Sequence, residues 1–248
     1  MLHTVFLHFI LLTSPLHLQE AAALKADEAY RQADYPSAIE QYEAVLANQY
    51  TSADLYYNLG NAYYRTDQLA LAILNYERAL RLKPSMSDAR ENLALAESKT
   101  VDSITPLPKF FLSRWVDFLC THISPAIWRI LWLSLLALTA LSVVIMRLGS
   151  SRKFRKVGLT TGVVSLVLLL LATLLLINAT RRFNAHREAI VLSPAVSIKS
   201  SPEQQGVDKM VLHEGTKLTI SDSLSGWYKI TIADGTSGWC QKESVERI

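Results

Sequence analysis

The chain has 248 residues, half of them hydrophobic, and a formal net charge of +3. The excess positive charge is concentrated in and around two long apolar runs, so it does not indicate a nucleic-acid-binding protein. The two cysteines, Cys120 and Cys240, are too few for a disulfide framework, and we interpret them as packing residues.

An apolar segment lies at residues 5–12, interrupted only by His8 and followed by Thr13, Ser14 and Pro15. It is too short to cross a bilayer and is similar to the hydrophobic region of a secretory signal. No Lys or Arg precedes it, and no clear cleavage motif follows it. We predict a signal-like segment over residues 1–19 and leave its cleavage open.

The chain repeats itself at an offset of 34 residues. The matching pairs are Tyr30/Tyr64, Arg31/Arg65, Ala38/Ala72, Ile39/Ile73, Tyr42/Tyr76, Glu43/Glu77 and Leu46/Leu80. A period of this length indicates stacked helical hairpins. Because two hairpins bury too little surface alone, we expect a capping helix over residues 86–98.

The second copy resembles the tetratricopeptide repeat. That family's spacing is matched by Tyr56, Leu59, Gly60, Tyr63, Ala72, Tyr76, Ala79 and Pro84. The first copy departs from the pattern at Lys25, Ala26 and Val45. The resemblance covers residues 20–99 and implies an α-helical repeat domain there.

In this family the first helix of each pair lines an inner groove that commonly holds an extended peptide. The resemblance therefore implies peptide-binding positions at Asp27, Tyr30, Arg31, Tyr57, Asn58, Asn61, Tyr64 and Arg65. Asn58 and Asn61 match positions whose amides grip the peptide backbone, whereas lysines that would clamp a terminal carboxylate are not evident. The alternative is that these residues form only a solvated polar face.

Residues 100–125 link the repeats to the first apolar run. Within this linker, residues 106–121 mix aromatic side chains with Lys109, Arg114 and Asp117, a composition that suits a helix lying in the membrane interface. Pro125 disfavours helix in the residue before it, so this helix should end there. The alternative is that the first membrane helix simply begins earlier.

Two apolar runs, residues 126–146 and 157–177, are each predicted to cross a membrane. As helices they would be about 31 Å long, which is enough for the hydrocarbon core. The predicted cytoplasmic loop between them, residues 147–156, carries Arg147, Arg152, Lys153, Arg155 and Lys156. Because basic loops stay in the cytoplasm, the soluble parts should both face the opposite side. The signal-like start agrees with this orientation, whereas Arg181, Arg182 and Arg187 count against it.

After a tether over residues 178–187, residues 188–248 show short alternating strands. The expected strands cover residues 189–192, 197–199, 217–221, 227–232 and 235–240. Asp234 and Gly235 are typical of the turn of a β-hairpin. Five strands in about 60 residues predict a small closed all-β barrel, because closure removes exposed strand edges.

The strings VLHEGTKLTI and GWYKITIADGTSGWC are similar to the bacterial SH3 domain. This resemblance implies an SH3-like barrel, in which Trp227, Tyr228 and Trp239 could form a peptide-binding surface. By strand alternation, core positions are the competing interpretation for two of the three aromatic residues.

No sequence motif for catalysis or cofactor binding is present. The chain lacks a GxxxxGK phosphate-binding loop, an HExxH zinc helix and a GxSxG nucleophile turn. His122, His186 and His213 are isolated in the sequence, and we interpret them as surface residues rather than metal ligands. We expect a non-catalytic protein without a cofactor or a metal.

Helical repeats, a two-pass anchor and an SH3-like barrel, in this order, resemble the BatE-type proteins of bacterial Bat (aerotolerance) operons. The expected fold class is a multidomain membrane protein. The resemblance implies an inner-membrane scaffold with both soluble domains in the periplasm. It also implies membrane-bound von Willebrand A proteins and a MoxR-type ATPase as partners. The alternative function is a tether or sensor that binds peptidoglycan through the SH3-like domain.

Overall fold

The computed structural model describes residues 15–248 apart from residues 49, 109 and 185–186. Most of the predicted signal-like segment and part of the tether therefore lie outside the described residues. The chain forms two compact units. Unit 1 combines Met1–Leu107 with Arg187–Ile248, and unit 2 is Pro108–His186.

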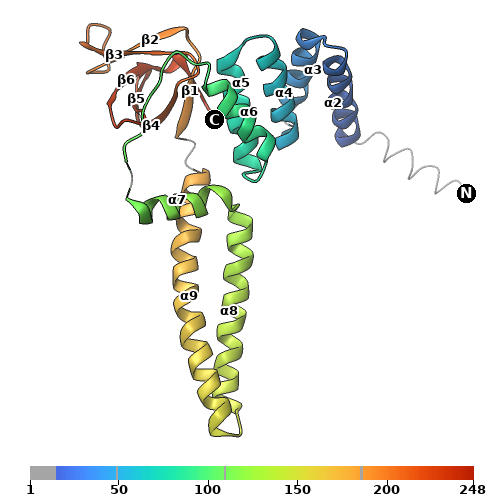
Figure 1. Cartoon of the computed structure of the whole chain (residues 1–248), viewed down its shortest axis with the longest axis vertical. Coiled ribbons are helices and arrows are strands. Elements are labelled where there is room, and N and C mark those ends of the chain that lie inside the picture. Colours follow the sequence, from blue (N-terminus) through green and yellow to red (C-terminus); the bar gives the residue numbers. More distant parts are fainter. Residues whose placement is uncertain (1–14, 49, 109, 185–186) are drawn as a thin grey trace, which may run out of the picture. The chain divides into compact units, whose positions relative to one another are not determined.

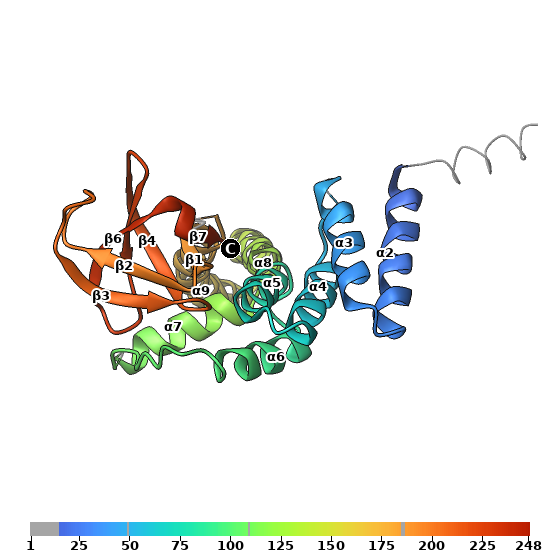
Figure 2. The ribbon, with the colours of Figure 1, turned by 90° about the horizontal axis from the view of Figure 1, so that it is seen from above.

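Five helices of unit 1 pack side by side in sequence order (Figures 1 and 2). They are α2 (Pro15–Arg31), α3 (Tyr35–Ala47), α4 (Ala53–Arg65), α5 (Leu69–Leu82) and α6 (Ser87–Glu97). α2 and α3 form the first hairpin, α4 and α5 form the second, and α6 is the predicted cap. Each hairpin turns at a residue with a φ of 60°, Ala33 in the first and Asp67 in the second. The predicted helical repeats are confirmed.

The same tyrosine contact holds each hairpin together. Tyr42 donates a hydrogen bond to Asp27 over 2.5 Å, and its counterpart Tyr76 donates one to Asn61 over 2.8 Å. In both repeats the acceptor lies 15 residues before the tyrosine. Gly60 allows the second ring to pack closely, because a Cβ there would come within 2.8 Å of two Tyr76 ring atoms. The sequence repeat is therefore also a repeat of buried contacts.

Unit 1 also contains a seven-stranded antiparallel sheet. Its strands are β1 (Glu188–Val191), β2 (Ala195–Lys199), β3 (Asp208–His213), β4 (Lys217–Leu224), β5 (Trp227–Thr231), β6 (Ser237–Gln241) and β7 (Val245–Arg247). Five of them overlap the predicted strands. The sequence does not predict β3, whose residues alternate weakly between buried and exposed, or β7, which has only three residues.

The predicted closed barrel does not form. The strand order is β3-β2-β6-β5-β4-β1-β7, so β3 and β7 are the two edges and do not pair with each other in the described part of the chain. At the β7 edge, Arg78 of α5 donates to the Arg247 carbonyl over 2.8 Å and to the Glu246 carboxylate over 2.9 Å. One backbone acceptor of this edge is therefore satisfied by a helix side chain instead of by another strand.

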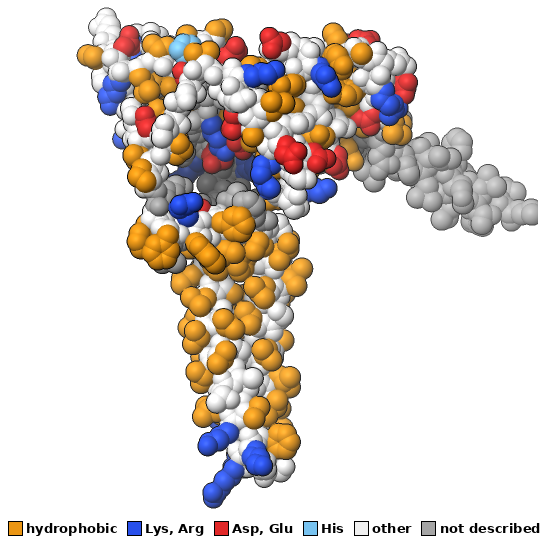
Figure 3. Space-filling view, in the orientation of Figure 1, with side chains coloured by type: hydrophobic (Ala, Val, Ile, Leu, Met, Phe, Trp, Pro, Cys, Tyr) orange, Lys and Arg blue, Asp and Glu red, His pale blue; other side chains and the backbone are white. Residues whose placement is uncertain are grey.

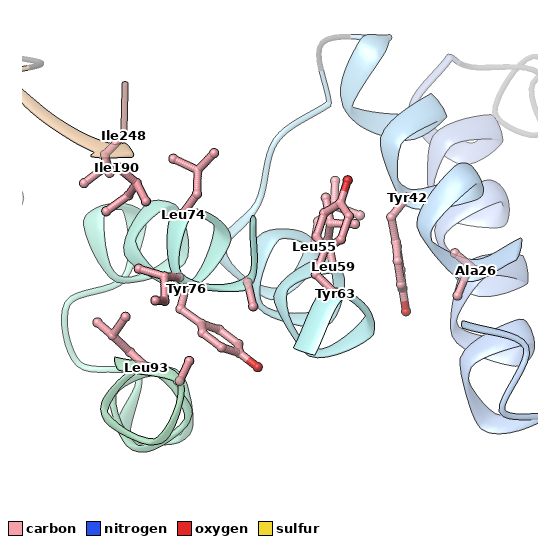
Figure 4. Packing of buried hydrophobic residues seen from close by; sticks show 14 of the residues in the cluster. Ala26, Tyr42, Leu55, Leu59, Tyr63, Leu74, Tyr76, Leu93, Ile190 and Ile248 are labelled. Atoms are coloured by element: carbon pink, nitrogen blue, oxygen red, sulfur yellow. The ribbon is translucent and has the colours of Figure 1, made fainter. Parts of the chain in front are cut away.

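The sheet and the helical stack share one hydrophobic core. Ile190 of β1 and Ile248 are buried in the cluster that contains Leu74 and Tyr76 of α5 (Figure 4). Lys217 at the start of β4 adds an ion pair of 2.7 Å to Glu77 of α5. The sheet therefore packs on the last repeat, although in the sequence residues 108–186 separate the two.

The segment after α6 also joins the stack to the sheet. Asp102 accepts hydrogen bonds from the His213 backbone N–H and the Thr216 hydroxyl, both at 2.7 Å, and its carboxylate lies 2.8 Å from the His213 ring. Burial opposes ionisation of this carboxyl, but the hydrogen bonds outweigh burial and lower the pKa of Asp102. Farther along, the Leu107 N–H donates to the Ala233 carbonyl over 3.1 Å.

Unit 2 consists of α7 (Phe111–His122), α8 (Pro125–Leu148) and α9 (Arg152–Asn184). Two segments, Ala126–Leu148 and Arg152–Thr180, are long and apolar enough to cross a membrane, with mean hydropathies of 2.1 and 2.6. Both predicted spans lie within them. α7 ends before α8 begins, so the first apolar helix does not extend back through residues 106–121 as the alternative expected. The position of α7 in a membrane interface stays a prediction.

Polar side chains join α8 to α9. Trp132 donates its indole N–H to the Thr173 hydroxyl over 2.9 Å, and the Thr139 and Ser165 hydroxyls are 3.0 Å apart. Near the turn the backbones approach closely, because a Cβ on Gly158 would lie 2.7 Å from the Met146 nitrogen. Small residues and interhelical hydrogen bonds are the contacts that hold helices together in lipid.

The shared core predicts that the stack and the sheet unfold together. Ile190→Ala should lower the free energy of unfolding by about 2 to 5 kcal/mol, because Ile190 is fully buried in the common cluster. Val211→Ala, at a half-exposed position of β3, should change it by less than about 0.5 kcal/mol. Thermal unfolding of the full chain in detergent, followed by far-ultraviolet circular dichroism and tryptophan fluorescence, measures both regions. Separate transitions for helices and sheet would contradict the shared core.

The glycines of α9 give a matched test of the hairpin. Gly158→Ala should destabilise the α8–α9 pair by about 1 to 3 kcal/mol, because the new methyl group meets the Met146 and Ser142 backbones within 3.0 Å. Gly162→Ala should be neutral or stabilising by up to about 1 kcal/mol, because its methyl group makes an ordinary 3.4 Å contact and alanine favours helix. Resistance to unfolding by sodium dodecyl sulfate in mixed micelles is the measurement. Equal effects of Gly158→Ala and Gly162→Ala on this resistance would show that α8 and α9 do not approach closely at Gly158.

Candidate peptide-binding groove

A cavity of about 400 Å³ opens in the helical stack of unit 1. We call it the tyrosine pocket. It is lined by Tyr30 of α2, Tyr57, Asn61, Tyr64 and Arg65 of α4, Tyr76 of α5, and Asn92 and Leu95 of α6. The first helix of each pair and the cap contribute most of the lining.

A hydrogen-bond network fixes the polar groups of the pocket. The Asn61 carbonyl oxygen accepts from the Tyr76 hydroxyl and from the Asn92 amide, both over 2.8 Å. Asn92 also donates to the Tyr57 oxygen over 3.3 Å. Burial raises the pKa of Tyr76 well above its usual range, so this hydroxyl remains a donor at any physiological pH. The Asn61 amide N–H₂ and the Tyr57 O–H are the donors that this network leaves over.

Two cations lie beside the pocket. The Arg65 guanidinium interacts with the Tyr30 hydroxyl, and this hydrogen bond raises the pKa of Arg65. The Lys99 ammonium lies 4.4 Å from the centre of the Tyr64 ring, within the range of a cation–π contact. None of the described residues that line the pocket is acidic. The pocket is therefore rich in hydrogen-bond donors and positive charge.

The structure gathers only part of the predicted peptide-binding set in this pocket. Tyr30, Tyr57, Asn61, Tyr64 and Arg65 line it. The other three predicted residues make contacts within the stack: Asn58 donates to Asp27 over 3.1 Å, and Arg31 pairs with Glu28 over 2.5 Å. The Asn58 amide is thus engaged by a side chain of the same unit, and its role in gripping a peptide stays a prediction.

The sequence interpretation did not identify Tyr76, Asn92, Leu95 or Lys99 as groove residues. A signal for two of them was present at the same offset of 34 residues. Asn92 follows Asn58 by one period, and Lys99 follows Arg65, which itself follows Arg31. Extending the repeat comparison into the capping helix would therefore have found the third layer of the groove.

The aromatic residues of the sheet do not share one face. Tyr228 pairs with the buried Cys240, whereas Trp239 pairs with Lys229, the next residue along β5. Because directly opposed residues point to the same side, Trp227 and Trp239 lie on one face of the sheet and Tyr228 on the other. Arg247 and Lys242 lie 4.9 and 5.2 Å from the Tyr228 ring centre. A binding surface made by these aromatic residues stays a prediction of the sequence.

Metal ligands do not gather anywhere in the part of the chain that the structure describes. His213 lies against Asp102 rather than near a cysteine. Cys240 is fully buried, and burial raises its pKa to about 11. A thiol with such a pKa is a poor nucleophile and a poor ligand at neutral pH.

Comparison with known families supports the helical repeats. The tetratricopeptide repeat family model matches residues 24–87 and again residues 60–98. The second match includes α6, so the cap is similar to the first helix of a third repeat. A search of curated proteins finds no match to this chain.

The hydrogen bonds distinguish Asn58, whose amide bonds to Asp27 within the helical stack, from Asn61, whose amide lies in the tyrosine pocket. Asn58→Ala should lower the free energy of unfolding by about 1 kcal/mol, because Asp27 loses one donor inside the stack. It should leave ligand affinity unchanged, because Asn58 does not line the tyrosine pocket. Urea unfolding of the full chain, followed by circular dichroism, measures the first effect. Wild-type stability of Asn58→Ala would show that the bond to Asp27 contributes nothing.

Proposed function

We propose that the chain is a non-catalytic membrane scaffold whose tyrosine pocket binds an extended, carboxylate-bearing segment of a partner protein. The observation that carries this proposal is the donor excess of the pocket. The Asn61 carbonyl oxygen accepts from Tyr76 and Asn92, and the Tyr57 oxygen accepts from Asn92, so within the described residues the Asn61 amide N–H₂ and the Tyr57 O–H have no acceptor. Arg65 and Lys99 add positive charge. A carboxylate accepts hydrogen bonds and donates none, so it is the complementary group.

The four tyrosines of the pocket support a peptide rather than a free small anion. Their rings offer flat apolar surface, on which the side chains beside the carboxylate can pack. Leu95, which is half-exposed at the cap, extends this apolar surface. A ligand with alternating apolar and acidic groups satisfies both the rings and the cations.

Membrane anchorage is supported by the α8–α9 hairpin. Its helices are long and apolar enough to span a bilayer, and its basic end should stay in the cytoplasm. In that orientation both segments of unit 1 emerge on the periplasmic face of an inner membrane. The resemblance to BatE-type proteins makes membrane-bound von Willebrand A proteins, acting with a MoxR-type ATPase, the first partner class to test.

Photo-crosslinking in native membranes tests this function. A benzophenone side chain at position 64, in the pocket, should capture a partner segment, and the same group at position 40, exposed on α3, should not. Arg65→Gln and Lys99→Gln should each weaken binding of the captured segment, made as a peptide, about tenfold. A hydrogen bond between charged groups contributes about 1.5 to 3 kcal/mol, and exposure reduces this.

The matched peptide control replaces each Asp and Glu of the captured segment by Asn and Gln. We expect the neutral peptide to bind more weakly than the acidic one. We also expect Arg65→Gln to leave the affinity for the neutral peptide unchanged. Equal binding of both peptides would contradict the proposed specificity for carboxylates.

An alkaline phosphatase reporter at Ser150 that proves active would contradict the proposed orientation.

A further inference from the structure

The end of the membrane hairpin carries a dense group of cations. Arg147 lies in the last turn of α8, and Arg152, Lys153, Arg155 and Lys156 lie in the first turns of α9. Only residues 149–151 separate the two helices. Figure 3 shows these side chains as a blue group beyond the orange flanks of the hairpin. We call this group the basic end.

Neighbouring residues in the sequence do not neutralise the positive charge of the basic end. No Asp or Glu occurs between residues 118 and 187. Arg155 donates to the Gly149 carbonyl over 3.0 Å and so holds the turn. For Arg147, Arg152, Lys153 and Lys156, the described residues supply no ion pair. Four cations therefore remain available to an external anion.

An external anion would be attracted by these basic side chains rather than by the backbone N–H groups at the start of α9. Ser151 occupies two N–H groups of the first turn: its side chain accepts from Phe154 over 3.4 Å, and its carbonyl accepts from Arg155 over 3.2 Å. Because Ser151 already accepts from these two N–H groups of α9, backbone N–H donors are not the main feature of the site.

Apolar side chains stand directly beside the cations. Phe154 is 60% exposed and Leu148 is 79% exposed. An exposed aromatic ring next to long basic side chains suits the boundary between lipid headgroups and acyl chains, where the ring enters the apolar layer and the cations meet phosphate. A soluble acidic protein would match the charge but would not require both apolar groups.

We propose that the basic end is a binding site for anionic phospholipid headgroups, held by Arg147, Arg152, Lys153 and Lys156 with Phe154 inserted beside them. This inference rests on the proposed membrane anchorage. It goes further, because retention of a loop in the cytoplasm requires only positive charge, whereas this site predicts selection among lipids. Each cation near an anionic surface should increase the preference about fivefold.

The test measures which lipid the full chain retains. The protein is reconstituted into vesicles of mixed phosphatidylglycerol and phosphatidylcholine, extracted with mild detergent, and its retained lipid is quantified by mass spectrometry. We expect enrichment of phosphatidylglycerol in the wild type. Arg152→Gln/Lys153→Gln/Lys156→Gln should reduce this enrichment by up to about a hundredfold at low salt. Salt at about 1 M should reduce it in the wild type as well.

A triple variant with the same charge change elsewhere is the control. Lys25→Gln/Lys83→Gln/Lys229→Gln removes three exposed cations of unit 1 and should leave the enrichment unchanged. Unchanged enrichment in the basic-end variant would overturn the proposal. So would equal retention of both lipids, or recovery from cells of a stoichiometric acidic protein in place of anionic lipid.

The two proposals can fail separately. Loss of crosslinking from position 64 with intact lipid enrichment would remove the peptide-binding function and leave the lipid site. Loss of enrichment with intact crosslinking would do the reverse. A Phe154→Ser variant adds a readout of the apolar contact, because it should reduce retained phosphatidylglycerol while all five cations remain.

Discussion

The burial of Ile190 and Ile248 against α5 is the contact on which the organisation of unit 1 depends. It joins strands from the end of the chain to helices from its beginning, although residues 108–186 separate them in the sequence. Beside this contact, Arg78 of α5 donates to the Arg247 carbonyl of the β7 edge strand. One patch of apolar packing thus joins the open sheet to the helical stack.

The same packing leaves the tyrosine pocket open. The sheet contacts α5, while the pocket takes most of its lining from α2, α4 and α6. Tyr76 connects the core to the pocket, since it belongs to the core cluster and also bonds Asn61 in the pocket. Core packing therefore sets the direction in which the pocket amide presents its donors.

Unit 2 follows different physics. α8 and α9 are joined by Trp132–Thr173, by Thr139–Ser165 and by the close approach at Gly158. Such contacts suit the proposed membrane, because in lipid apolar side chains gain nothing by meeting each other. These contacts engage Thr139, Ser165 and Thr173, three of the polar residues of the apolar runs. At the end of the hairpin Arg155 holds the turn, but the described residues supply no ion pair for Arg147, Arg152, Lys153 or Lys156. These four cations are the ones that can meet an external anion.

Local patterns in the sequence by themselves determined the helical repeats, the two apolar helices and five of the seven strands, because periodicity and composition act over short distances. The resemblance to the tetratricopeptide repeat proposed eight groove positions, and five of them, Tyr30, Tyr57, Asn61, Tyr64 and Arg65, line the tyrosine pocket, while their role in binding stays a prediction. Only the tertiary structure decided that Asn58 is engaged by Asp27 and that the sheet stays open on α5. Each of these depends on a partner distant in the chain, and no local pattern contains that partner.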